Sequence, residues 1–150
     1  MKVLIPVDSS IYSRAALDSV LACPWPLQTE FTILSVSESG HPRTDYWNPH
    51  SRELLLEAER KVLESHERLA ASFAAELKQR FPQAQVESKV VEGFVVDKIL
   101  EVAEHWRADL IVLGSHGLKG LTRFLIGSVS EAVASHAHCS VRIVRCPEGK

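Results

Sequence analysis

Glycines and serines in the C-terminal third of the chain have a spacing that suits phosphate binding. Gly114, Gly117 and Gly127 follow an apolar run, and a short helix is expected to begin at Ser128. Glycine lets a backbone approach a phosphate closely, and a helix N-terminus offers free N–H groups and the positive end of its dipole to an anion. The expected donors are the backbone N–H groups and serine hydroxyls of Ser128, Val129 and Ser130.

The same segment also has a purely structural interpretation. Ser128-Val-Ser-Glu131 is a capping-box pattern, in which the serine caps the helix and the glutamate returns a hydrogen bond. A carboxylate at Glu131 would also compete with a bound anion. Lys119 and Arg123 place positive charge after the expected strand, which favours a phosphate. Both interpretations stay open at this point.

Two further residues near the expected site can bind a ligand or serve the fold alone. Asp8 ends the first apolar run and could accept hydrogen bonds from a ribose or a base, or it could begin an Asx turn. His116 lies within the glycine-containing loop, where it could contact phosphates or be exposed.

Several kinds of site are disfavoured. The sequence has no GxxxxGK[ST] motif and no GxGxxG in its first strand–helix turn, which argues against a P-loop hydrolase and a dinucleotide dehydrogenase. His136, His138 and Cys139 lack partners at the spacing of a four-ligand zinc site, so we expect no protein-held metal. No nucleophile with a neighbouring base is recognisable, so no catalytic residue is assigned. A response-regulator fold would need clustered acids, and Asp8 has no acidic neighbour.

The elements that would position these residues alternate along the chain. Apolar runs predict strands at residues 2–7, 31–36, 86–91, 109–113 and 141–145. Helical periodicity predicts helices at 11–22, 52–80, 94–106 and 128–136, with a long loop at 37–51. This alternation predicts one doubly wound α/β domain over 1–150, with parallel strands and helices on both faces. Ligands bind such sheets at the carboxyl ends of the strands, so Asp8 and the glycine loop face each other if the first and fourth strands are neighbours.

The composition limits the class of protein. Of 150 residues, 45% are hydrophobic and 24% charged, which suffices for one packed domain, and the net charge of −2 argues against a nucleic-acid partner. No apolar run is long enough to span a bilayer and no leader pattern is present, so no membrane partner is expected. Three cysteines without a CxxC pair fit a reducing compartment, so we expect a cytoplasmic protein.

The motifs together resemble a known family. Gly114-x2-Gly117-x9-Gly127-Ser128 is similar to the nucleotide-binding signature of the ATP-binding branch of the universal stress protein family. The opening Ile5-Pro-Val-Asp-Ser-Ser and the closing Cys139-Ser-Val-Arg-Ile-Val also resemble the family, so the similarity covers essentially the whole chain and is weakest over 37–51. Ser140 departs from the proline that the family more often has there.

The resemblance implies a sheet, a ligand and a partner. The sheet would have five parallel strands in the order 3-2-1-4-5. Adenine would lie near Pro6, Val7, Asp8 and Val36, while Asp8, Leu113 and Gly114 would hold the adenosine. The phosphates would be surrounded by His116, Gly117, Gly127, Ser128, Val129 and Ser130. Mg²⁺ or Mn²⁺ would be bound through the phosphates rather than by a protein cage.

These expectations combine into one functional hypothesis. The protein would be a stress-response or signalling protein that binds ATP, with AMP or ADP as further candidates, and turns it over little. The alternative is a slow ATP-hydrolysing or nucleotidyl-transferring enzyme on the same fold. The strand at 141–145 would lie at an open sheet edge, which together with the resemblance predicts a homodimer through that strand.

Overall fold

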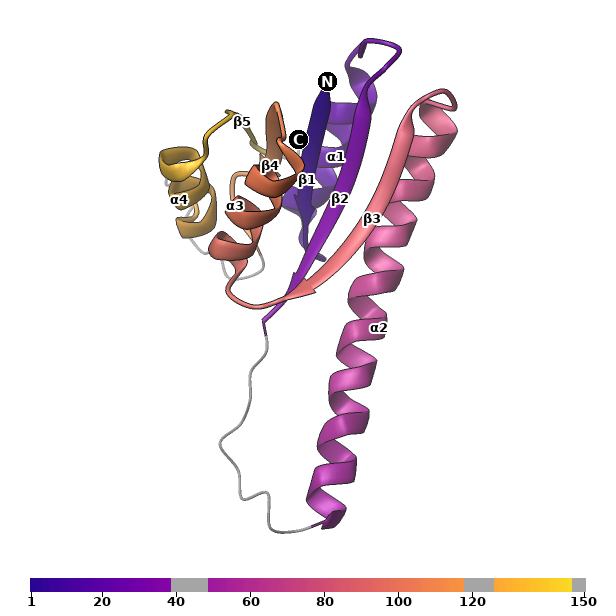
Figure 1. Cartoon of the computed structure of the whole chain (residues 1–150), viewed down its shortest axis with the longest axis vertical. Coiled ribbons are helices and arrows are strands. Elements are labelled where there is room, and N and C mark those ends of the chain that lie inside the picture. The colour runs from indigo at the N-terminus through magenta and orange to yellow at the C-terminus, as the bar shows by residue number, and fades with distance from the viewer. Residues whose placement is uncertain (39–48, 118–125, 147–150) are drawn as a thin grey trace.

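The computed structural model describes residues 1–38, 49–117 and 126–146 (Figure 1). In this part of the chain, five parallel strands form one sheet in the order β3-β2-β1-β4-β5, as predicted. The strands are β1 (Lys2–Val7), β2 (Glu30–Ser37), β3 (Gln85–Glu92), β4 (Leu110–Gly114) and β5 (Ser140–Val144).

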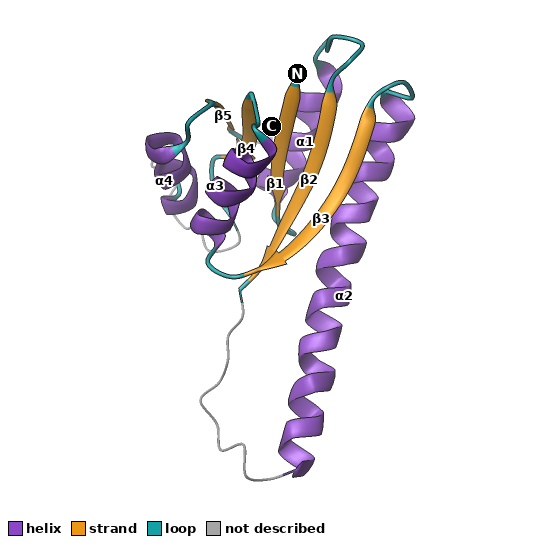
Figure 2. Ribbon diagram, viewed as in Figure 1, coloured by secondary structure: helices purple, strands orange, loops and turns teal. Residues whose placement is uncertain are grey.

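Helices cover both faces of the sheet, which gives a single α/β domain with three layers (Figure 2). The helices are α1 (Ile11–Ala22), α2 (Pro49–Arg80), α3 (Val95–Trp106) and α4 (Ser128–His136). One core packs α1 and α2 against the sheet around Phe31 and Ile33, and the other packs α3 and α4 around Leu34 and Ile111. Successive strand residues alternate between these cores because side chains alternate across a sheet.

One predicted boundary was wrong by more than a residue. The second helix was expected from residue 52, but α2 begins at Pro49. Proline suits the first turn of a helix, because the N–H group that it lacks would have no intrahelical acceptor there. The predicted loop therefore shrinks at both ends, since β2 also extends to Ser37. Tyr46 and Trp47 of that loop lie outside the described residues.

Helix α1 is fixed at its start and against α2. Ser10 is its N-cap and accepts a hydrogen bond from the backbone N–H of Ser13 at 3.2 Å. Both terminal nitrogens of Arg14 donate to the carboxylate of Glu76 in α2, at 2.7 and 2.8 Å. Hydrogen bonds to Glu76 and then Asp18 raise the pKa of the Arg14 guanidinium above its ordinary value. The first helix, which borders the predicted site, is thus tied to the longest one.

Within residues 1–38, 49–117 and 126–146, no helix combines the length and the apolar composition needed to cross a bilayer.

Candidate functional site

The carboxyl ends of β1 and β4 lie side by side, as the site hypothesis required. The two strands pair in parallel, with Val3 opposite Leu110 and Leu4 opposite Ile111. Asp8 follows β1 and Gly117 follows β4. A Cβ atom built on Gly117 would lie 2.9 Å from Oδ2 of Asp8. The two segments predicted to hold a ligand therefore meet at the carboxyl end of the sheet. A side chain at position 117 would crowd the Asp8 carboxylate.

The Asp8 carboxylate is held by the first turn of α1. Its Oδ1 accepts hydrogen bonds from the backbone N–H of Ser10 at 3.0 Å and from the hydroxyls of Ser10 and Ser13 at 2.5 and 2.6 Å. The N–H of Asp8 donates in turn to the Ser13 hydroxyl at 2.9 Å. The bond from Ser10 N–H is the Asx turn that the sequence allowed. A carboxylate with this many donors is fixed in one orientation.

Sequence reasoning missed the role of Ser13. It is 5% exposed and both donates to and accepts from Asp8. The signal was the run Asp8-Ser-Ser-x-x-Ser13, in which the last serine lies one helical turn beyond the cap.

Gly114 is required by the packing of α1 against the end of β4. A Cβ atom at this position would lie 2.6 Å from the backbone carbon and oxygen of Tyr12 in α1. Real Cβ atoms essentially never approach backbone this closely, so helix α1 can lie over the end of β4 only because residue 114 is glycine. The Tyr12 ring also lies against His116, with 5.0 Å between ring centroids.

The capping-box interpretation of α4 is wrong. The N-cap is Gly127, without a side-chain cap, and Ser128 is the first helical residue, so Glu131 is the fourth. The cause is the close approach to β4: the Gly127 N–H donates to the Ser115 carbonyl at 2.7 Å, and a Cβ at 127 would lie 3.1 Å from that oxygen. The first N–H with an acceptor inside the helix belongs to Glu131, which donates to the Gly127 carbonyl at 2.9 Å.

The first turn of α4 consequently has backbone donors to offer. The N–H groups of Ser128, Val129 and Ser130 have no acceptor inside the helix, and they lie at the positive end of its dipole. The hydroxyl of Ser130, expected to be a further donor to the ligand, instead donates to the Gly114 carbonyl at 2.7 Å. Ser130 is 2% exposed, so this hydroxyl fastens α4 to the end of β4.

His116 brings a buried polar atom to the same place. Its Nδ1 lies 3.1 Å from the Ser115 hydroxyl. Its Nε2 is buried and has no hydrogen-bond partner among the described residues. Buried polar atoms nearly always have a partner, so this nitrogen is a candidate contact for a ligand.

The remaining predicted site residues are apolar and lie at the same strand ends. Pro6 and Val7 end β1, and Leu113 is 4% exposed near the end of β4. Val36 and Leu113 pack in the α3–α4 core, whereas the side chain of Val7 packs in the α1–α2 core. Lys119 and Arg123, which were expected to add positive charge, lie outside the described residues.

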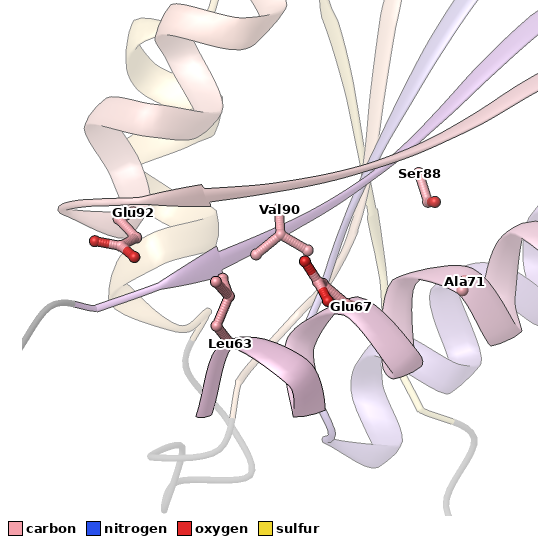
Figure 3. A pocket seen from close by; sticks show the side chains of 6 residues that line it. All are labelled: Leu63, Glu67, Ala71, Ser88, Val90 and Glu92. Carbon is pink, nitrogen blue, oxygen red and sulfur yellow. The ribbon is translucent and has the colours of Figure 1, made fainter. Parts of the chain in front are cut away.

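Two hollows of the described surface lie beside the carboxyl ends of β1 and β4. A groove of about 530 Å³ between α2 and β3 is shown in Figure 3 and is lined by Leu63, Glu67, Ala71, Ser88, Val90 and Glu92. Two carboxylates in its lining make it unsuitable for a phosphate. A second groove, of about 450 Å³, runs between α1 and the end of β5.

The described residues bring no set of protein ligands together for a metal. Within the described ranges, no group of three or more His, Cys, Asp or Glu side chains could hold an ion. Of the histidines near the end of α4, His136 uses its Nδ1 in a 2.8 Å hydrogen bond with the Ala132 carbonyl.

Comparison with known proteins decides the family. The sequence profile of the Universal stress protein family matches residues 1–145. The chain belongs to the universal stress protein family. A universal stress protein of Methanocaldococcus jannaschii is 32% identical over 151 residues, which cover 98% of this chain and 83% of the relative. The resemblance to this family is thus confirmed.

Solved structures share the fold along the whole chain. The hypothetical protein MJ0577 superposes with a TM-score of 0.83 at 26% identity, covering 99% of this chain and 97% of that one. A universal stress protein family protein of Arabidopsis thaliana, solved with AMP bound, has a TM-score of 0.68 at 17% identity, covering 99% and 93%. A universal stress protein solved in complex with cAMP has a TM-score of 0.64 at 22% identity, covering 96% of each chain. The last two likenesses establish the fold alone.

Proposed function

We propose that this universal stress protein binds ATP at the carboxyl ends of β1, β2 and β4 and releases it largely unhydrolysed. The nucleoside would lie on the β1 side, against Pro6, Val7, Asp8 and Val36, with Leu113 and Gly114 beside it. The phosphates would lie on the α4 side, against His116, Gly117, Gly127, Ser128, Val129 and Ser130.

The observation that carries the proposal is the combination of donors at the start of α4. Three backbone N–H groups without an intrahelical acceptor follow Gly127, at which a Cβ atom would lie 3.2 Å from Cα of His116. Nε2 of His116 is buried and has no described partner. Gly127 caps the helix without a side chain, so nothing from the cap residue itself covers those N–H groups. Such an arrangement suits an anion with several oxygens, and a phosphate chain is one.

An acceptor for the nucleoside lies at the opposite side of the same edge. Asp8 is fixed by Ser10 and Ser13 and lies against Gly117, so an oriented carboxylate faces the segment that follows β4. AMP in the Arabidopsis protein and cAMP in another universal stress protein fit the same division into a nucleoside and a phosphate. Adenine nucleotides of different phosphate length are therefore the ligands to compare.

We propose slow turnover because the chain lacks a P-loop motif, whose lysine would stabilise a transferring phosphoryl group. A bound Mg²⁺ or Mn²⁺ would neutralise phosphate charge and would be held mainly by the phosphates. We also propose a reducing compartment such as the cytoplasm, in keeping with the unpaired thiols of Cys23, Cys139 and Cys146.

A melting experiment with nucleotides tests the binding proposal. At about 100 times the dissociation constant, a ligand stabilises the native state by about 2.7 kcal/mol, or roughly 5–10 °C for a domain of this size. We expect this shift with ATP and Mg²⁺, and a smaller one with AMP. No shift at millimolar ATP would refute the proposal. Phosphate release at a kcat near 10 per second, roughly the enzyme median, would favour the ATP-hydrolysing alternative.

We further propose that two copies pair along β5. The strand lies at the edge of the sheet, and Ser115 N–H donates to the Val144 carbonyl at 2.8 Å, so Val144 points its backbone groups toward β4. Backbone groups alternate along a strand, which turns those of Val141 and Ile143 toward the open edge.

This alternation gives a clean test of the dimer. Val141→Pro removes an edge N–H without breaking the β4–β5 ladder, while Val141→Ala keeps the N–H. We expect a dimeric mass by light scattering for the wild type and Val141→Ala, and a monomeric mass for Val141→Pro. A wild-type monomer at tens of micromolar, or a dimeric Val141→Pro, would count against pairing through β5.

A further inference from the structure

A histidine on α2 is hydrogen-bonded to a sheet residue next to the proposed site. His66 places its Nδ1 2.8 Å from the hydroxyl of Ser35 in β2. Ser35 is 0% exposed, and its hydroxyl also lies 3.3 Å from the Val7 carbonyl at the end of β1. Three elements, α2, β2 and β1, are thus joined by one short chain of hydrogen bonds. Figure 1 shows α2 running alongside β2 and β3, with its N-terminal half extending past the carboxyl ends of the strands.

The proton positions in this chain follow from its chemistry. A serine hydroxyl has one proton, and a carbonyl oxygen can only accept. If Ser35 donates to Val7, it must accept from His66, so His66 carries its proton on Nδ1. Only this assignment makes both contacts of the buried Ser35 hydroxyl hydrogen bonds, which favours it.

The series of hydrogen bonds from His66 ends at the peptide unit between Val7 and Asp8. The carbonyl of this unit belongs to Val7 and accepts from Ser35, while its N–H belongs to Asp8 and donates to Ser13 at 2.9 Å. The peptide plane is therefore held from both sides, by α2 through β2 and by α1. The direction in which the Asp8 side chain leaves the backbone depends on this plane.

We propose that His66 is a positioning residue for Asp8, acting through Ser35 and the Val7 carbonyl. It does not touch the ligand in this account. Its effect on nucleotide affinity rests on the proposed function, whereas its effect on the Val7–Asp8 peptide does not. Because Asp8 lies on the β1 side of the site, loss of His66 weakens contacts to the nucleoside. It leaves contacts to the phosphates at α4 unchanged.

Two variants separate the hydrogen bond from simple packing. His66→Leu removes the donor, and His66→Asn keeps an N–H near the position of Nδ1. For His66→Leu we expect an ATP dissociation constant about 5-fold higher, an unchanged constant for tripolyphosphate, and recovery to within about 2-fold in His66→Asn. Unchanged ATP affinity in His66→Leu overturns the proposal. An equal loss for tripolyphosphate, or no recovery in His66→Asn, assigns the effect to general distortion and overturns it too.

Nuclear magnetic resonance of the ligand-free protein tests the same series of hydrogen bonds without nucleotide. We expect the proton of neutral His66 on Nδ1, and an Asp8 amide signal that shifts in His66→Leu and Ser35→Ala and returns in His66→Asn. A proton on Nε2, or an Asp8 amide indifferent to both variants, overturns the proposal even if ATP binds. If the wild type does not bind ATP while these signals behave as expected, the proposed function fails and the positioning role stands.

Discussion

The two corners of the proposed site differ in how their polar groups are satisfied. In the β1–α1 corner, residues 7–13, the Asp8 carboxylate and the backbone around it are bonded to Ser10, Ser13 and Ser35. In the β4–α4 corner, residues 113–117 and 126–130, three N–H groups have no intrahelical acceptor and His116 Nε2 has no described partner.

The difference indicates that the two corners have different roles. A corner whose polar groups are already hydrogen-bonded is rigid, and we infer that it orients the nucleoside. A corner with unused donors gains most from an anion, because the free N–H groups and the positive dipole end of a helix N-terminus attract negative charge. The contact between Tyr12 and Gly114 joins the two corners, so it is the place where both can be disturbed at once.

The largest effect is expected at that contact. Gly114→Ala would place Cβ 2.6 Å from the Tyr12 backbone, which cannot move away without moving α1. We expect a loss of about 3 kcal/mol, lowering Tm by roughly 6–12 °C. Gly127→Ala is the matched variant, because its nearest atoms lie at 3.1 and 3.2 Å, and it should lose clearly less. Equal losses in thermal melts would show that the two glycines are not distinguished by packing.

A smaller effect is expected from removing the carboxylate of the β1–α1 corner. Asp8→Ala removes the acceptor of the Ser10 and Ser13 hydroxyls, and we expect a loss of about 2 kcal/mol with an ATP dissociation constant about 10-fold higher. Asp8→Asn keeps an acceptor oxygen, so its stability and its ATP affinity should lie between those of the wild type and of Asp8→Ala. Denaturant unfolding and calorimetric titration measure the two quantities. Wild-type ATP affinity in Asp8→Ala would remove Asp8 from the site.

The smallest effect compares two serines of α4. Ser130→Ala leaves the Gly114 carbonyl without its 2.7 Å donor in a buried place, at a cost of about 1–2 kcal/mol. The exposed Ser135 donates to the Glu131 carbonyl at 2.9 Å, and Ser135→Ala should change stability by less than about 0.5 kcal/mol. If both variants unfold at the same denaturant concentration, the Ser130 bond does not fasten α4 to β4.

Most of the fold was predictable because its signals are local. Apolar runs and helical periodicity predicted every strand and helix of the described residues, and all boundaries except the start of α2 lie within one residue. The strand order came from the family resemblance and is confirmed. The start of α2 was missed because Pro49 and the two polar residues after it are equally typical of a loop.

The site was less predictable because its details depend on distances between segments far apart in sequence. Nothing local to Gly114 indicates that Tyr12 lies 2.6 Å from its missing Cβ. The capping-box pattern at Ser128 was misleading because the bond from Gly127 to Ser115 moves the cap one residue earlier. The links from Ser35 to His66 and from Ser130 to Gly114 are likewise invisible in the sequence.

The most direct test of the phosphate side is a calorimetric titration of ATP and Mg²⁺ into two variants of one residue. Ser128 is the first residue of α4 and follows Gly127 at φ −64° and ψ 149°, a conformation that proline accepts in the residue before it. Ser128→Pro therefore removes one free N–H while keeping the helix, and Ser128→Ala keeps the N–H and removes only the hydroxyl. We predict apo melting temperatures close to the wild type for both, ATP affinity within about 3-fold of the wild type for Ser128→Ala, and a loss of about 10-fold or more for Ser128→Pro. Wild-type affinity in a folded Ser128→Pro variant would contradict the claim that the phosphates bind at the N-terminus of α4.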